Sequence, residues 1–171
     1  MHDNRATVLA ALLVVAAVAA VPVGGATAGS NAEAVESLQE TTDDCELPYT
    51  ATDATGTEVT VEERPERIVS LGPGTAQTLV ELGAGDRIVG ASQYANYLEG
   101  SDAWANVSGP GRTFASVEKV VAQKPDLVLA ENIVPNETVQ QLRSAGITVY
   151  KFRSATGLQD VYDKVNRTGR L

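Results

Sequence analysis

The feature that most constrains the fold is a set of short runs of consecutive apolar residues, separated by stretches of helical character. Such runs are too short for helices and too apolar for half-exposed strands, which is typical of parallel strands covered by helices on both faces. The runs are residues 67–71, 87–89, 126–130 and 147–150. We therefore predict an α/β fold: a small three-layer sandwich with a central, mostly parallel sheet of about four strands.

An N-terminal β-hairpin is expected ahead of this sheet. Residues 49–52 and 58–61 are short β-like runs, and residues 53–56 between them include Asp53 and Gly56, which favour a tight turn. In a parallel sheet, ligands bind beyond the carboxyl ends of the strands. The loops that follow the apolar runs are therefore where binding residues are sought.

Capping signals predict where two of the helices begin. Asn136 is expected to cap a helix that Gly146 ends. Thr156, with Gln159 three residues later, predicts a capping box at the start of the last helix. The apolar face of that last helix follows the spacing i, i+3, i+4, i+7 and consists of Leu158, Val161, Tyr162 and Val165.

The first 46 residues are expected to lie outside the folded unit. Residues 1–28 carry a long apolar run followed by small residues and are predicted to be a secretory signal peptide, with a retained membrane anchor as the alternative. Residues 29–46 hold six acidic residues and no basic one, which predicts a disordered acidic spacer. In an extracytoplasmic chain the single cysteine, Cys45, can form a disulfide. Three glycosylation sequons agree with that location: Asn106, Asn136 and Asn166.

The composition argues against several classes of function. The formal net charge of −9 disfavours nucleic acid as a partner, because phosphate binding needs a basic surface. The single histidine, His2, precedes the apolar leader, so the folded part has none for a Ser-His or Cys-His pair or for a His-ligated zinc site. We therefore expect no enzyme activity, no cofactor and no metal site.

Three segments in order, residues 65–97, 115–130 and 136–152, resemble the periplasmic substrate-binding proteins of ABC importers, of the cobalamin and ferric-siderophore type. The resemblance implies one lobe of a bilobal protein whose lobes are joined by a long helix and hold the ligand between them. Residues 47–156 would be the N-terminal lobe and residues 157–171 the truncated start of the interlobe helix. The implied function is capture of a ferric siderophore or cobalamin outside the cell and delivery to membrane permease subunits.

Four ligand-binding candidates come from loops that match this family. Tyr94 and Tyr97 follow the second run, and Tyr94 matches a position where cobalamin-binding relatives place an aromatic residue. Arg112 takes a position where hydroxamate-siderophore binders can carry arginine, and its guanidinium suits oxygen-rich groups, which favours a ferric siderophore over cobalamin. Phe114 would line the same rim or pack the following helix onto the core.

The remaining candidates lie at other strand ends. Gly72 and Pro73 form a tight strand-to-helix turn, and backbone N–H groups at that helix start could face an anionic ligand. Asn132 ends the third run and would touch the ligand. Glu118 matches the family glutamate that docks on permease arginines, although the first turn of a helix favours an acidic residue in any case.

Two other functions stay open at this point. One is a non-transport surface glycoprotein module or an inactive, truncated binding lobe. The other is a nucleotide-using α/β enzyme, but the loop Gly72-Pro73-Gly74 lacks the third glycine of a dinucleotide-binding motif.

Overall fold

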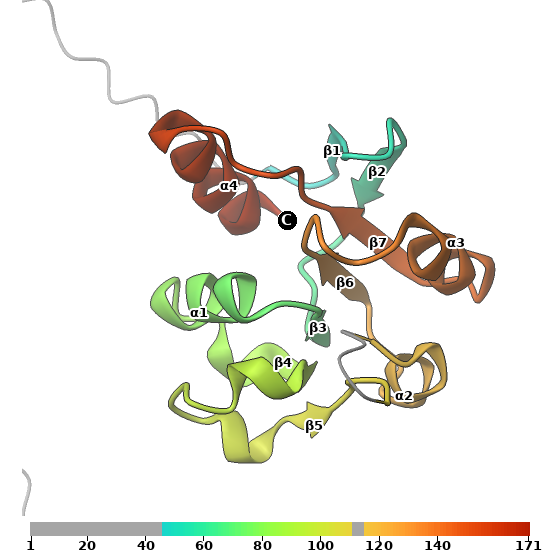
Figure 1. The fold of residues 1–171 in the computed structure, drawn as a ribbon. Helices are drawn as coiled ribbons and strands as arrows, with labels where there is room; N and C mark the ends of the chain where they lie inside the picture. The colour runs from blue at the N-terminus through green and yellow to red at the C-terminus, as the bar shows by residue number, and fades with distance from the viewer. Residues whose placement is uncertain (1–45, 111–114) are drawn as a thin grey trace, which may run out of the picture. The chain divides into compact units, whose positions relative to one another are not determined.

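A five-stranded parallel sheet forms the centre of the computed structural model, which describes residues 46–110 and 115–171 (Figure 1). The strands lie in the order β5-β4-β3-β6-β7, and each neighbouring pair runs parallel. Their bounds are Ile68–Ser70 (β3), Ile88–Ala91 (β4), Ala105–Asn106 (β5), Leu127–Ala130 (β6) and Thr148–Lys151 (β7). The predicted α/β sandwich is confirmed, with β5 as a short additional strand.

Helices cover both faces of this sheet, with α1 and α4 on one face and α2 and α3 on the other (Figure 1). Their bounds are Pro73–Glu81 (α1), Val117–Ala122 (α2), Asn136–Ser144 (α3) and Leu158–Arg170 (α4). The predicted hairpin is also present, as the antiparallel pair Tyr49–Thr52 (β1) and Glu58–Val61 (β2). None of the helices in residues 46–110 and 115–171 is long and apolar enough to cross a membrane.

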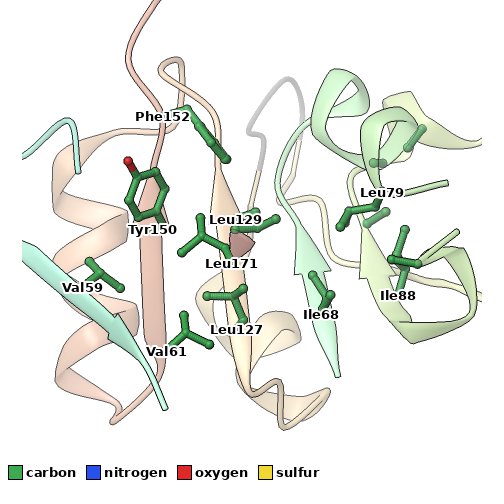
Figure 2. Packing of buried hydrophobic residues seen from close by; sticks show 14 of the residues in the cluster. Val59, Val61, Ile68, Leu79, Ile88, Leu127, Leu129, Tyr150, Phe152 and Leu171 are labelled. Atoms are coloured by element: carbon green, nitrogen blue, oxygen red, sulfur yellow. The ribbon is translucent and has the colours of Figure 1, made fainter. Parts of the chain in front are cut away.

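Strand β6 shows how the sequence builds two apolar layers. All four of its residues are buried, and successive side chains point to opposite faces. Leu127 and Leu129 pack with the hairpin, α1 and Tyr150, whereas Val128 and Ala130 pack with residues of α2 and α3 (Figure 2 shows the first layer). Burying a leucine fully contributes about 1.5–3 kcal/mol, so a strand that is apolar on both faces stabilises both layers.

The strand order places a topological switch point between β3 and β6. After β3 the chain crosses through α1 on one face, and after β6 it crosses through α3 on the other face. Loops that leave neighbouring strands toward opposite faces open a crevice at the carboxyl ends of those strands. In this protein the switch point lies where Gly72 and Glu131 follow β3 and β6.

A buried carboxylate ties the hairpin to the sheet and to α3. The side chain of Asp53 is fully buried and accepts hydrogen bonds from the Thr55 backbone N–H and hydroxyl, the Lys151 backbone N–H and the Arg143 guanidinium, the last at 2.6 Å. Burial raises the pKa of Asp53, but these hydrogen bonds outweigh burial and leave its pKa below the ordinary value. The turn predicted from Asp53 and Gly56 is therefore also a link between distant elements.

Both helix-capping predictions are wrong in detail. Pro135 occupies the N-cap position of α3, and the side-chain oxygen of Asn136 instead accepts a hydrogen bond from the Lys151 ammonium group. At the start of α4, the Thr156 backbone N–H and hydroxyl donate to the Asp160 carboxylate at 2.6 and 2.7 Å, while Gln159 bonds elsewhere. These bonds lower the pKa of Asp160. Gly146 does follow α3, as predicted, with a φ of 82° that favours glycine.

The orientation of α4 also differs from the usual packing of an amphipathic helix. Its apolar face points to solvent, with Leu158 and Tyr162 exposed by 67% and 60% and Val161 and Val165 by 44% and 39%. The helix contacts the sheet side through polar residues, among them Lys164 and the buried Thr168. On this side Lys164 donates to Glu131 and Arg167 donates to the hydroxyl of Tyr49 in the hairpin, which holds the polar face of α4 toward the sheet.

Candidate ligand-binding site

Several of the predicted binding residues lie at the carboxyl edge, by which we mean the loops that directly follow β3, β4, β5 and β6. The loops after β3 and β4 are joined by a hydrogen bond from the Ser92 backbone N–H to the Ser70 carbonyl, at 3.1 Å. Gly72 and Pro73 follow β3, and Asn132 follows β6 as an exposed residue. The parallel strands therefore bring together residues that are about 60 positions apart in the chain.

The Glu131 side chain lies at the switch point, against Gly72 and the start of α1. One carboxylate oxygen, Oε1, accepts hydrogen bonds from the Thr75 backbone N–H at 3.0 Å and from the Thr75 hydroxyl at 3.2 Å. The Lys164 Nζ of α4 lies 3.3 Å from the same oxygen. A carboxylate in this position satisfies a backbone N–H at the start of α1 and interacts favourably with the helix dipole. Glu131 thus accepts a hydrogen bond from one of the backbone N–H groups at the start of α1, the groups that the sequence analysis proposed for an anionic ligand.

Gly72 is required by this arrangement. A Cβ atom at Gly72 would lie 2.2 Å from Cδ and 2.4 Å from Cγ of Glu131, far inside the contact distance of carbon atoms. The backbone of Gly72 is extended, with φ −169°, so its conformation does not demand glycine. Glu131, Thr75 and Lys164 were not predicted from the sequence; the available signal was an acidic residue directly after a buried strand.

The two tyrosines predicted to contact ligand are both exposed at the loop after β4. Tyr94 lies in the 3₁₀ turn Gln93–Ala95 and is 38% exposed, and Tyr97 is 64% exposed. The Tyr97 hydroxyl donates to the side-chain oxygen of Gln77 at 3.4 Å, which places Tyr97 beside α1. The loop therefore offers exposed aromatic surface beside the middle of α1.

Glu118 is exposed in the first turn of α2, as predicted. The Ser116 hydroxyl donates to its carboxylate at 2.8 Å, and this bond is the main reason why the pKa of Glu118 is lowered. The carboxylate is therefore kept ionised and accessible. Arg112 and Phe114 lie outside the described residues, so their positions relative to the tyrosines stay a prediction.

The described part of the carboxyl edge offers hydrogen-bonding groups and exposed aromatic surface. Within residues 46–110 and 115–171, no cluster of three or more histidine, cysteine or acidic residues could hold a metal ion. Aromatic rings combined with a few polar groups are typical of sites that bind small molecules.

Comparison with known proteins identifies the family. The model of the periplasmic binding protein family matches residues 68–171. A cobalamin-binding protein of Halobacterium salinarum is 48% identical over 127 residues, which cover 74% of this chain and 34% of that protein. An uncharacterized ABC transporter substrate-binding lipoprotein of Bacillus subtilis, YvrC, is 34% identical, covering 72% of this chain and 39% of the relative.

Solved structures agree with the sequence relatives. The heme binding protein HmuT superimposes with a TM-score of 0.65 at 26% identity, covering 73% of this chain and 40% of HmuT. The vitamin B12 binding protein BtuF of Vibrio cholerae gives a TM-score of 0.53 at 27% identity, covering 61% of this chain and 40% of BtuF. The chain thus spans between about a third and two fifths of the length of these relatives. Because the family model matches more than half of the chain, the chain belongs to the periplasmic binding protein family.

Proposed function

We propose that this protein is the N-terminal lobe of a solute-binding component of an ABC importer, and that its carboxyl edge holds a corrinoid. The observation that carries the proposal is the exposed aromatic surface of Tyr94 and Tyr97 in the loop after β4, at the carboxyl edge. A flat macrocycle gains most from such rings, because they offer large apolar area at a low cost in conformational entropy. The 48% identity to a cobalamin-binding protein supports the same ligand class.

A ferric siderophore is the second candidate, and Arg112 is the residue that favours it. Its guanidinium can donate several hydrogen bonds to oxygen-rich iron ligands. The two ligands make different demands on the site: the corrinoid depends mainly on aromatic contact at Tyr94, and the siderophore mainly on the charge of Arg112.

Titration calorimetry of the full chain with cyanocobalamin and with ferrichrome tests both candidates. Replacing Tyr94 by alanine should weaken corrinoid binding at least fivefold, whereas Tyr162→Ala, which removes an exposed ring from α4, should leave it unchanged. Arg112→Ala should weaken ferrichrome binding by a similar factor if the siderophore is the ligand. Absence of binding to both ligands by a folded chain would contradict a binding role and favour a surface module or an inactive lobe.

The outward-facing apolar stripe of α4 supports the interpretation of residues 157–171 as the start of an interlobe helix. The stripe consists of Leu158, Val161, Tyr162 and Val165, and an exposed apolar face of this kind marks an interaction site. Relatives about three times as long as the matched region carry further sequence that could cover it. The part of the Halobacterium salinarum relative outside the matched region, added in trans, should bind the chain, and Tyr162→Glu should abolish the complex seen by analytical ultracentrifugation.

The location and the transport partner are part of the same proposal. Residues 1–28 would be removed on export, which the substrate-binding lipoprotein among the relatives supports. The three sequon asparagines, at positions 106, 136 and 166, are exposed and would accept glycans outside the cell. Glu118 would contact arginines of the permease subunits, since its side chain is ionised and exposed.

A further inference from the structure

A small pocket lies at the carboxyl ends of β4 and β5, in the loop that also carries Tyr94. Its volume is about 110 Å³. No residue that lines it is titratable, so the pocket offers only neutral hydrogen-bonding groups and apolar surface. The lining residues that matter for its chemistry are Ser92, Asn96, Ser101, Trp104 and Asn106.

Ser92 is the unusual member of this set. It is 2% exposed, and within the described residues its hydroxyl oxygen has no hydrogen-bond partner. The hydroxyl of Ser70, which is also fully buried, shows the ordinary situation, because it donates to the Gly72 carbonyl at 2.9 Å. A buried hydroxyl without a hydrogen bond is unfavourable, so a ligand group that hydrogen-bonds to it would remove this penalty.

Some of the neighbouring polar groups already form hydrogen bonds within the protein. The Ser101 hydroxyl donates to the Asn96 carbonyl at 3.0 Å, and the side-chain oxygen of Asn106 accepts from the Ser108 backbone N–H at 2.9 Å. These bonds orient Ser101 and Asn106, whereas the Ser92 hydroxyl has no hydrogen bond within the described residues. The Trp104 indole supplies a flat apolar wall.

We propose that this pocket is a subsite for an uncharged carboxamide arm of the bound ligand. This inference rests on the proposed function, since it places the body of the ligand over the carboxyl edge. A carboxamide both donates and accepts hydrogen bonds, which matches a serine hydroxyl. A carboxylate of the same shape would exchange its hydration for the neutral groups that line the pocket, which is unfavourable. Corrinoids carry several carboxamide arms, whereas heme carries carboxylates.

The test uses propionamide and propionate, which differ in charge but hardly in shape, with the full chain. The chain has one tryptophan, so its indole N–H gives a single NMR signal that reports directly on the pocket. Propionamide should shift this signal saturably, and at least tenfold more tightly than propionate. Ser92→Ala should weaken propionamide binding at least fivefold, and Ala105→Leu, which adds bulk to a half-buried lining residue, should block the pocket.

Ser144→Ala, which removes an exposed hydroxyl from α3, is the control and should leave propionamide binding unchanged. The subsite is refuted if propionamide causes no saturable shift, if propionate binds as tightly, or if Ser92→Ala binds like the wild type. These results are separate from the test of the proposed function. A chain that binds propionamide at Ser92 but not cyanocobalamin retains the subsite and loses the proposed function, and the reverse result removes the subsite alone.

Discussion

The contact between Gly72 and Glu131 makes a sharp prediction about stability. Replacing Gly72 by alanine places a Cβ atom 2.2 Å from Cδ of Glu131, so the glutamate side chain must leave its position. Once it leaves, the hydrogen bonds from Thr75 and the ion pair with Lys164 are lost. The cost of Gly72→Ala should therefore approach the cost of removing the glutamate altogether.

The magnitude follows from the interactions of Glu131. A hydrogen bond to a charged acceptor contributes about 1.5 kcal/mol at the lower end of its range, and a carboxylate at a helix N-terminus adds about 0.3–1 kcal/mol. The pair with Lys164 is partly exposed, with side-chain exposures of 26% and 14%, and contributes below about 1 kcal/mol. Both Gly72→Ala and Glu131→Ala should thus lower the free energy of unfolding by about 2–3 kcal/mol.

A double-mutant cycle in urea, followed by circular dichroism, measures the coupling between the two positions. The double variant should be about as stable as Glu131→Ala alone, because the added methyl group no longer meets a side chain. Gly157→Ala is the matched control: Gly157 is also an extended N-cap glycine, but a Cβ there would meet nothing within 4 Å. Its effect should stay below about 1 kcal/mol. Additive effects of Gly72→Ala and Glu131→Ala would refute the steric explanation.

Three further predictions concern the buried carboxylate, the exposed stripe and the exposed acid. Asp53→Asn should lower the free energy of unfolding by about 3 kcal/mol, because it leaves Arg143 without its charged partner. Folding lowers the pKa of Asp53, so its contribution to the free energy of unfolding is present above about pH 4 and is lost as the pH falls further. The urea midpoint of Asp53→Asn should therefore change less between about pH 5 and pH 3 than the midpoint of the wild type. Leu129→Ala should lower the free energy of unfolding by about 2–5 kcal/mol, whereas Leu158→Ala should change it by no more than about 0.5 kcal/mol in the same urea assay. Equal effects of the two substitutions would show that α4 buries its apolar face. Glu118→Gln should reduce stimulation of permease ATPase activity without changing the unfolding temperature or ligand affinity, and unchanged stimulation would exclude Glu118 from docking.

The central strands were predictable because their signal is local. Residues that are apolar on both faces of a strand must be buried on both sides, so the runs at β3, β4, β6 and β7 determine a parallel sheet covered by helices. Strand β5 was missed because two residues, Ala105 and Asn106, carry no periodic pattern. Its place is set by pairing with β4, which the sequence does not reveal.

Most of the polar contacts that hold the fold could not be predicted because they join residues far apart in the chain. Asn136 carries an ordinary capping signal, but its side-chain oxygen accepts a hydrogen bond from Lys151 instead. The Thr156 contact is local, but its partner is Asp160, four residues later, and not the Gln159 of a capping box. The spacing of the apolar residues predicted the stripe of α4 but not its direction, which depends on the contacts of Lys164 with Glu131 and of Arg167 with Tyr49. The exposed tyrosines were predicted correctly as carboxyl-edge residues, although their contact with ligand is still untested.

The short length of β5 has a consequence for how the protein associates with other chains. Unpaired backbone groups along the border of a sheet can recruit a strand from another molecule and start aggregation. Here the strand at one border, β5, has only two residues, which pair with Gly90 and Ala91 of β4. At the other border the backbone N–H of Ala54 in the hairpin turn donates to the carbonyl of Lys151. The two borders of the five-stranded sheet therefore offer little unpaired backbone to a strand from another molecule. Self-assembly of this chain should proceed through helix packing, and thioflavin-positive fibrils should not be its main failure mode.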